Sequence, residues 1–364
     1  MFADIFAGKK VLVTGNTGFK GSWLTIWLLK LGAHVYGLSK DIPTEPSMFK
    51  ELHLGEKIEY FEQDIRDVEK VIEIIGDIKP DFIFHLAAQP IVSISYKNPI
   101  ETISSNIIGT ANILEGLRLS NHNCVAIIIT SDKCYDNVEW VWGYRETDRL
   151  GGKDIYSGSK AAAELVIRSY YQSFFRDSNI RLASVRAGNV IGGGDWAVDR
   201  IVPDCMRAWS NGKAVEIRSP YATRPWQHVL EPLSGYLKLA HKLMGDKKLD
   251  GESFNFGPQA ENNFTVRQII EDMSKFWGFE DKSKSYIMAK ESSFLEAGLL
   301  KLNCDKALYH LEWLPTLGYS EMIEYVSVWY YKYYRKDEDM YGFTLSQIGD
   351  YEKKAKGKGL GWTQ

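Results

Sequence analysis

The stretch that most constrains the fold is an apolar run followed directly by a glycine-rich turn and an amphipathic segment. Residues 10–14 have the pattern of a buried strand, and residues 22–30 have that of a helix. Between them Gly15, Gly18 and Gly21 are spaced as G-x-x-G-x-x-G. Strand, glycine turn and helix in this order predict a dinucleotide-phosphate site, because glycines let the backbone approach a pyrophosphate and a helix N-terminus attracts its charge. A purely structural turn is the alternative interpretation.

Further apolar runs predict the rest of the sheet. They lie at residues 32–39, 58–63, 82–90, 124–129 and 181–186, with helical patterns between them. This rhythm predicts an α/β fold, a Rossmann-type doubly wound parallel sheet with a smaller C-terminal substrate lobe. The alternation becomes less regular in the glycine-rich stretch after residue 187. We therefore expect a dinucleotide-binding domain at 1–187, a lobe at 188–335 and a C-terminal tail at 336–364, with residues 353–358 solvated and with later segments free to return to the first domain.

Composition indicates an ordinary globular protein with a small partner. The chain has 364 residues, 45% hydrophobic and 25% charged, and a formal net charge of -3, so no basic surface for nucleic acid is expected. Its four cysteines and seven histidines have no spacing typical of a disulfide frame or metal site. No signal peptide is recognised, and no apolar run approaches the ~18 residues of a membrane span. We expect a soluble, cytoplasmic protein that binds no membrane and no metal.

The cofactor site is predicted to extend from the glycine turn to the ends of the next strands. Asp41 lies about 20 residues after Gly21, where an acid bonds the ribose hydroxyls, and this favours NAD over NADP although Lys40 is adjacent. Asp64 either reaches the adenine or caps the next helix. Small residues at 87–88 would let the fourth strand lie against the cofactor. The full predicted set is Gly15, Asn16, Thr17, Gly18, Phe19, Lys20, Gly21, Asp41, Asp64, Ile65, Leu86, Ala87, Ala88, Asn106, Tyr156 and Lys160.

Tyr156 and Lys160 are the candidate general base and its partner. If a helix begins near Ser157, the two side chains stand about one turn apart and point at one small volume. A phenol with a pKa near ~10 needs about 3 units of help to act as a base at neutral pH, more than an exposed ion pair supplies. Lys160 must therefore act in a partly dry cleft. Ser131, Asp132 and Lys133 follow the fifth predicted strand, at the sheet edge where ligands bind.

Several longer tracts resemble the extended short-chain dehydrogenase/reductase superfamily over about residues 10–334, and within it the nucleotide-sugar 4,6-dehydratases. The tracts are TGFKGSWL (17–24), TSDKCYDN (130–137), WVWGYRE (140–146), RAGNVIGGGDWA (186–197) and RPWQHVLEPLSGY (224–236). They are far more specific than a glycine triplet. Asn16 departs from the pattern, since related sequences often have histidine at this position beside the pyrophosphate.

The resemblance implies an internal redox cycle with NAD. Tyr156, polarised by Lys160, takes the proton of the sugar 4-hydroxyl while hydride passes from C4 to NAD+, and Ser131 hydrogen-bonds the same oxygen. Asp132 resembles the acid that protonates the leaving 6-hydroxyl, and the hydride returns to C6. Related dehydratases place Glu where this chain has Lys133. Lys133 is either a neutral amine that takes the C5 proton or a charged stabiliser of the C5 enolate.

The resemblance also implies the substrate, CDP-glucose, and a role in deoxysugar biosynthesis of the lipopolysaccharide O-antigen type. The implied substrate residues are Gln89, Asn189, Arg200, Arg218, Arg224 and His228. Arginines suit a pyrophosphate, although isolated arginines are more often surface ion-pair partners, and a lone histidine is more often a core residue. A homodimer through helices near residues 102–118 and 157–174 is expected. Alternatives are another nucleotide-sugar dehydratase or 4-epimerase and, in a different class, a non-catalytic NAD-binding sensor.

Overall fold

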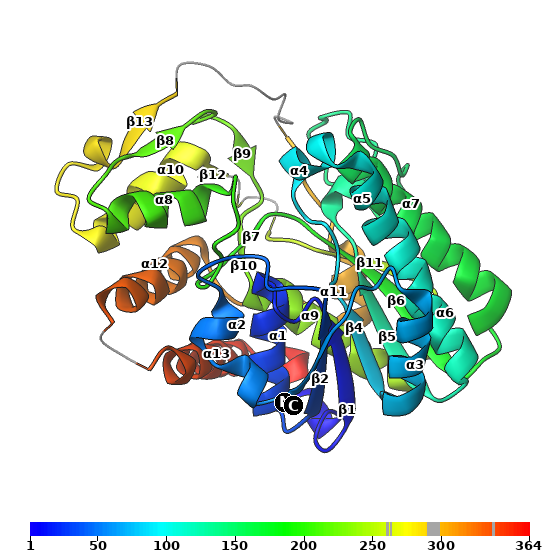
Figure 1. Ribbon diagram of the computed structural model, residues 1–364. Helices are drawn as coiled ribbons and strands as arrows, with labels where there is room; N and C mark the ends of the chain where they lie inside the picture. The colour runs from blue at the N-terminus through cyan, green and yellow to red at the C-terminus, as the bar shows by residue number, and fades with distance from the viewer. Residues whose placement is uncertain (260–261, 263, 290–298, 337–338) are drawn as a thin grey trace.

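A seven-stranded parallel sheet forms the centre of the computed structural model, which describes residues 1–259, 262, 264–289, 299–336 and 339–364 (Figure 1). The strand order is β11-β6-β5-β4-β1-β2-β3. The strands are β1 (Lys10–Thr14), β2 (His34–Ser39), β3 (Glu59–Glu62), β4 (Phe82–His85), β5 (Cys124–Ile129), β6 (Ile180–Ala187) and β11 (Ser253–Phe256). Each neighbouring pair is parallel, so the predicted doubly wound sheet is confirmed.

Helices cover both faces of the sheet because successive strand residues point to opposite sides. In β1, Leu12 packs with the apolar side chains of α3 (Val68–Ile78) and α6 (Gly109–Ser120). Val11 and Val13 pack on the other face, in the cluster that contains Trp27 of α1 (Phe19–Lys30). α7 (Ile155–Tyr170) lies beside α6, and α9 (Leu230–Gly245) covers the second face. The sheet core is therefore apolar on both sides.

The lobe lies beyond the carboxyl ends of the strands, at the upper left of Figure 1. Three short strand pairs form it together with α8 (Ile201–Ser210) and α10 (Val266–Ser274). The pairs are β7 (Val190–Ile191) with β10 (Gln227–His228), β8 (Val215–Ile217) with β13 (Tyr286–Met288), and β9 (Thr223–Arg224) with β12 (Phe264–Thr265). Between β10 and β12 the chain returns to the sheet domain, where α9 packs against the sheet and β11 pairs with β6. Other helices are α2 (Met48–Glu51), α4 (Val92–Lys97), α5 (Pro99–Ile103) and α11 (Asp305–Leu311).

The C-terminal segment is helical and is packed on one face, which the sequence did not predict. Residues Met340–Gly357 form helix α13, which follows α12 (Tyr319–Arg335) and packs against α1. Glu352 of α13 accepts a hydrogen bond of 2.9 Å from Trp27 Nε1 and is paired with Lys30. Tyr351, Ala355 and Trp362 are fully buried. The lysines at 353, 356 and 358 do face solvent, but they stand on the outer face of a packed segment.

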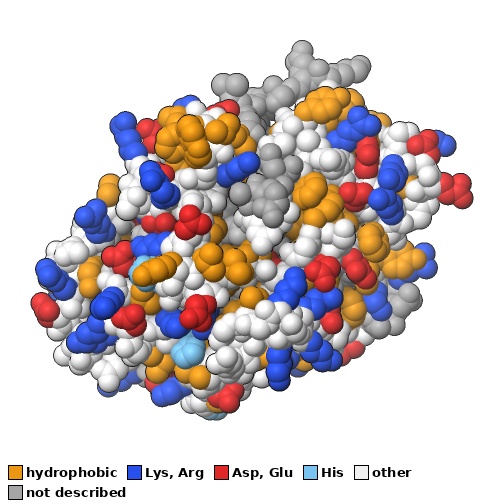
Figure 2. Space-filling view, turned by 180° about the vertical axis from the view of Figure 1, so that it is seen from behind, with side chains coloured by type: hydrophobic (Ala, Val, Ile, Leu, Met, Phe, Trp, Pro, Cys, Tyr) orange, Lys and Arg blue, Asp and Glu red, His pale blue; other side chains and the backbone are white. Residues whose placement is uncertain are grey.

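The surface mixes charges of both signs. Figure 2 shows Lys and Arg side chains interspersed with Asp and Glu over the face opposite to that of Figure 1. Among the described residues, every helix is too short or too polar to cross a bilayer.

Candidate active site

The glycine turn between β1 and α1 forms a cradle that other residues would fill. Gly15 has a φ of +72°, and a Cβ there would lie 2.7 Å from the Ala87 backbone nitrogen. A Cβ at Gly21 would lie 2.1 Å from the Gly15 oxygen. Gly18 is the N-cap of α1, whose first turn carries no acidic side chain and no side-chain cap. The Gly15 and Gly18 N–H groups donate to backbone carbonyls, whereas the N–H groups of the first turn of α1 have no acceptor within the helix and are available to an anion, so the cradle fits a dinucleotide pyrophosphate.

The residues predicted for the adenosine half line the ends of β1, β2 and β3. The Asn16 side chain is buried and accepts 2.8 Å from Ser39 Oγ, and Thr17 Oγ1 donates to the Asp41 carbonyl at 2.8 Å. The Asp41 carboxylate is half exposed and lies 3.8 Å from Lys40. Asp64 is paired with Arg66 at 2.6 Å, so its carboxylate already has a partner.

Ile65, Leu86, Ala87 and Ala88 complete this side of the cleft. Ile65 packs against Gly109 of α6, where a Cβ would lie 2.4 Å from its Cδ1. Leu86 and Ala87 follow β4, and the Ala87 N–H donates to Thr14 Oγ1 at 3.1 Å. The chain between β4 and α4 is thus held against the end of β1, as the cradle requires.

Asn106 joins the loop after β4 to the catalytic helix. It lies in a π-helical turn, Ser104–Ile108, a local widening that often occurs at functional sites. Its Oδ1 accepts from the Gln89 N–H at 2.8 Å, and its Nδ2 donates to the Gln89 carbonyl at 3.1 Å and to Ser159 Oγ at 2.9 Å. Gln89 itself donates to Thr102 at 2.8 Å. Asn106 therefore holds the Gln89 loop against α7.

α7 presents Tyr156 and Lys160 to the cleft. Asp154 caps the helix by accepting from the Ser157 N–H at 2.9 Å, so Tyr156 lies in the first turn and Lys160 one turn later. The two are 7% and 5% exposed, the dry environment expected from the sequence. Burial lowers the pKa of Lys160 to about 8. Burial raises the pKa of Tyr156 to about 12, against a hydrogen bond with Ser131 that lowers it. In the protein without ligands, desolvation therefore outweighs the Ser131 hydrogen bond and the Arg200 cation, and the phenol pKa is not lowered.

Ser131, Asp132 and Lys133 stand at the carboxyl end of β5, facing the first turn of α7. Ser131 Oγ donates to Asp132 Oδ1 at 3.0 Å, and Lys133 Nζ lies 4.0 Å from the same oxygen. Asp132 is 2% exposed, and its Oδ2 is buried without a hydrogen-bond partner among the described residues. A Cβ at Gly188 would lie 3.2 Å from Oδ2, so this glycine opens the space around the carboxyl group. The sequence did not identify Gly188 as a site residue. Only the end of β6 in the fold brings it next to Asp132.

Lys20 belongs to this site as well as to the glycine turn. Its pKa is lowered to about 8, chiefly by burial and also by the nearby cations Arg200, Lys160 and Lys133, while Asp132 acts in the opposite direction. Lys20 thus lies close to one carboxyl group and to three other cations. The sequence motif places Lys20 only with the cofactor phosphates, because its proximity to Asp132 depends on how α1 and the end of β5 meet in the fold.

The lobe contributes the predicted diphosphate residues. Arg200 Nη1 donates to Asp195 at 2.8 Å and is near enough to Tyr156 to affect its pKa. Arg218 lies 3.7 Å from Asp199, and Arg224 Nη1 donates to the Thr223 carbonyl at 2.8 Å. The Asn189 carbonyl accepts from the Gln227 N–H at 3.1 Å, at the start of the lobe.

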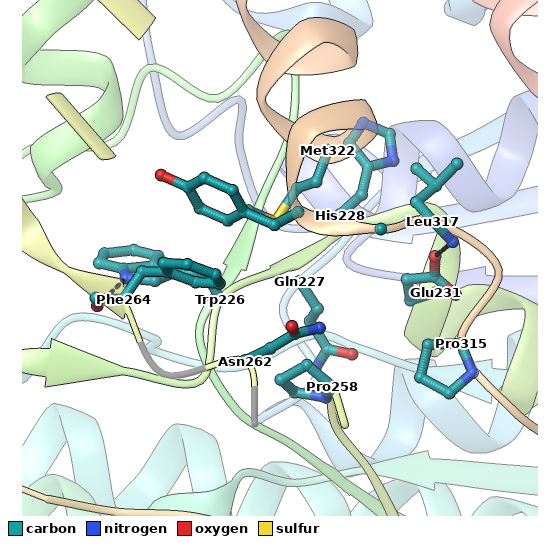
Figure 3. A pocket seen from close by; sticks show the side chains of 12 residues that line it. Trp226, Gln227, His228, Glu231, Pro258, Asn262, Phe264, Pro315, Leu317 and Met322 are labelled. Carbon is teal, nitrogen blue, oxygen red and sulfur yellow. Dashed lines mark hydrogen bonds between the residues drawn. The ribbon is translucent and has the colours of Figure 1, made fainter. Parts of the chain in front are cut away.

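His228 lies in the core and lines a pocket behind β10 (Figure 3). It is fully buried, its ring packs edge-on against Trp23 and Tyr325, and its Nδ1 accepts from the Leu230 N–H at 3.3 Å. Burial lowers its pKa to about 3. The predicted substrate residue His228 therefore has the environment of a core histidine.

Comparisons with known proteins identify the family and the fold. The model of the family described as GDP-mannose 4,6 dehydratase matches residues 12–326. The chain is 47% identical to the CDP-glucose 4,6-dehydratase of Salmonella typhimurium, over 96% of this chain and 97% of that protein. Among solved structures, dTDP-glucose 4,6-dehydratase from Bacillus anthracis in complex with NAD superposes with a TM-score of 0.74 at 21% identity, covering 89% and 97% of the two chains. UDP-glucose 4-epimerase from Thermotoga maritima, with UDP-glucose, gives 0.76 at 24% identity, covering 90% and 99%. The two superpositions show the fold.

Proposed function

We propose that this chain, which belongs to the GDP-mannose 4,6 dehydratase family, is an NAD-dependent hydro-lyase that converts CDP-D-glucose to CDP-4-dehydro-6-deoxy-D-glucose and water. The observation that carries the proposal is the arrangement of Ser131, Asp132 and Lys133 opposite Tyr156 and Lys160. An epimerase needs the tyrosine and lysine, whereas loss of water also needs an acid and a base on the same side of the sugar. The 47% identity to a CDP-glucose 4,6-dehydratase supports the choice of sugar nucleotide.

The NAD site is proposed to extend along the ends of β1, β2, β3 and β4. The glycine cradle would hold the pyrophosphate, Asp41 the ribose, and Asp64 and Ile65 the adenine end. Leu86, Ala87, Ala88 and Asn106 would line the nicotinamide side. Bound NAD would supply the redox chemistry, by taking a hydride from C4 of the sugar and returning it at C6.

Tyr156 takes the proton of the sugar 4-hydroxyl, and Ser131 donates a hydrogen bond to the same oxygen. Lys160 is charged below its pKa of about 8. In the water-poor cleft its ammonium group stabilises the phenolate. Arg200, Arg218, Arg224, Asn189 and Gln89 hold the CDP-sugar. His228 is not included, because its ring is enclosed by Trp23 and Tyr325.

Asp132 and Lys133 carry out the two proton transfers of the dehydration step, one to the sugar and one from it. In the reactive form Asp132 is a carboxylic acid and Lys133 a neutral amine. The amine takes the C5 proton while Asp132 Oδ2, which is buried without a partner among the described residues, gives its proton to the leaving 6-hydroxyl. The products are a carboxylate and an ammonium, the pair that lies 4.0 Å apart in the structure. Transfer of one proton between them restores the starting form.

Incubating the protein and NAD with CDP-glucose, dTDP-glucose and GDP-mannose in parallel tests the proposal. We expect a 4-keto-6-deoxysugar, detected by its absorbance after alkali treatment, from CDP-glucose in preference to the other two. A product that differs only in configuration at C4 would identify an epimerase. Binding of NAD with no turnover of any sugar nucleotide would identify a sensor.

We also propose that the protein is a cytoplasmic homodimer. α5, α6 and α7 lie side by side on the outside of the molecule (Figure 1). Large apolar side chains on this helical face are exposed, among them Ile100 (74%), Ile108 (50%) and Leu165 (54%). A second copy of the same face would cover them. The described cysteines are all free thiols, which suits a reducing compartment.

A further inference from the structure

Glu164 and Arg186 form a buried ion pair one helical turn behind Lys160. Arg186 Nε and Nη2 donate to the two carboxylate oxygens of Glu164 at 3.0 and 2.8 Å, and both side chains are 3% exposed. A bidentate pair has favourable geometry, but taking two charges out of water is expensive, and such a pair is often no more stabilising than apolar residues of the same size. Stability is therefore a weak explanation for a pair at this position.

The Glu164 carboxylate also joins the elements that carry the active site. It accepts from Thr130 Oγ1, from Ser184 Oγ at 2.8 Å and from Ser253 Oγ at 3.2 Å. Thr130 immediately precedes Ser131 at the end of β5, whereas Glu164 is on the helix that carries Tyr156. The Glu164 carboxylate thus links the segment that carries the serine to the helix that carries the tyrosine, in addition to the hydrogen bonds of Thr130 with the Val185 carbonyl.

Arg186 extends the connection to the segment after Asp132. Its Nη1 donates to Tyr135 Oη at 2.8 Å and to the Glu146 carbonyl at 3.1 Å. Tyr135 directly follows the 3-10 turn Asp132–Cys134, and its hydroxyl donates to Asn255 at 2.8 Å. The ion pair therefore holds both ends of the turn that contains Asp132 and Lys133.

The pair also controls the electrostatic environment of Lys160. The charges and titratable groups around Lys160 are Glu164 and Tyr156 on its own helix, Cys134, Lys20 of α1 and His85 of β4. Burial lowers the pKa of Lys160, and Glu164 is the strongest influence that raises it. Without the Glu164 carboxylate, an unpaired Arg186 would add a second unfavourable cation behind the ammonium.

We infer that Glu164 and Arg186 are positioning residues, which together set the spacing between the Ser131 and Tyr156 segments, while each charge cancels the effect of the other on Lys160. The inference rests on the proposed role of Lys160. Because the two charges have opposite signs, neutralising Glu164 and neutralising Arg186 should shift the pKa of Lys160 in opposite directions.

The test measures the pKa of Lys160 in Glu164→Gln, Arg186→Met and the double variant. NMR of protein with isotopically labelled lysine gives the titration, and the Lys160 signal is assigned by its loss in Lys160→Met. We expect the pKa of Lys160 to fall by about one unit or more in Glu164→Gln, to rise in Arg186→Met, and to return near the wild-type value in the double variant. No shift in either single variant, or shifts of the same sign, would overturn the inference.

Turnover of the sugar nucleotide separates positioning from charge. Thr130→Val keeps both charges and removes one hydrogen bond to Glu164, so we expect kcat to fall several-fold with the pKa of Lys160 unchanged. If a single variant does not fold, the double variant, in which no buried charge is left alone, carries the test: a wild-type kcat there would overturn the positioning role. The NMR titration needs no substrate, so absence of turnover in the wild-type protein would count against the proposed function alone.

Discussion

The indole Nε1 of Trp23 donates a hydrogen bond of 2.8 Å to the backbone carbonyl of Gly193, which joins α1 to the first loop of the lobe. Gly193 cannot carry a side chain in this position, because its Cβ would lie 2.1 Å from the Trp329 ring. Lys20, three residues before Trp23 on α1, lies near Asp132 and Lys160 of the active site. The position of the lobe relative to the glycine cradle thus depends on a tryptophan of the cofactor-binding helix.

Trp23→Phe should therefore weaken both folding and substrate binding. The change leaves the buried Gly193 carbonyl unpaired, and we expect the free energy of unfolding to drop by about 1–3 kcal/mol, with a raised KM for the sugar nucleotide. Urea denaturation and initial-rate kinetics measure the two effects. Trp142→Phe, at a side chain that is 68% exposed, is the matched control and should change stability by less than about 0.5 kcal/mol. Equal effects in the two variants would contradict the role given to the contact.

Lys133→Met should stop the entry of solvent deuterium at C5 of the sugar, because the variant has no amine to take the proton. Lys133→Arg is the control, since a guanidinium keeps the charge but does not lose its proton. If Lys133 is the base, both variants fail to exchange. Exchange retained in the arginine variant alone would assign Lys133 to electrostatic stabilisation of the enolate. Unchanged exchange in the methionine variant would remove it from the step.

Lys160→Met should move the acid limb of the kcat/KM profile to higher pH. The phenol of Tyr156 must lose its proton to act, and the ammonium favours the anion, so removing the charge raises the pKa of the phenol further above its value of about 12 in the ligand-free protein. Lys160→Arg keeps the charge and should retain more of the wild-type limb. Tyr156→Phe should lower kcat by about 10²–10⁴-fold at every pH. Tyr309→Phe, at an 82% exposed tyrosine, should leave the profile unchanged.

Gly21→Ala should abolish NAD binding. The added Cβ would lie 2.1 Å from the Gly15 oxygen, and the turn cannot keep its shape around it. Gly76→Ala, in the last turn of α3 with nothing within 4 Å of the added Cβ, should bind NAD normally and gain about 0.4–1 kcal/mol in stability. Calorimetric titration with NAD, together with thermal unfolding, compares the two. Wild-type affinity in Gly21→Ala would place the cofactor elsewhere.

Leu165→Asp should convert the dimer to a monomer, because it puts a charge in the centre of the proposed apolar face of α5, α6 and α7. Sedimentation velocity measures the mass. Met288→Asp, at a side chain of similar exposure on β13, removes an apolar group from a different surface and should remain dimeric. A monomeric wild-type protein would contradict the proposed interface directly.

Local patterns were sufficient to predict the strand–turn–helix unit at residues 10–30 and the strands around it, because period and glycine spacing act over short distances. The position of Tyr156 was also predictable, since Asp154 caps its helix. Features that join distant segments were not. α13 was missed because its buried residues, such as Tyr351 and Ala355, are separated by lysines, and only the face of α1 shows what covers them.

The site shows the same division. Motifs identified Ser131, Asp132 and Lys160, but nothing in the sequence near Glu164 or Arg186 indicates that the two side chains meet. His228 was assigned to the substrate by its motif, whereas packing with Trp23 and Tyr325 places it in the core.

The pairing of β11 with β6 has a consequence for the order of events during synthesis. The seventh strand of the sheet leaves the ribosome only after the first part of the lobe, and the helix that covers Trp27 follows about a hundred residues later. A nascent chain that has reached Ala187 therefore has an unprotected sheet edge and an uncovered apolar face. Such a chain is expected to stay incompletely folded, or to need a chaperone, until the later segments have been synthesised.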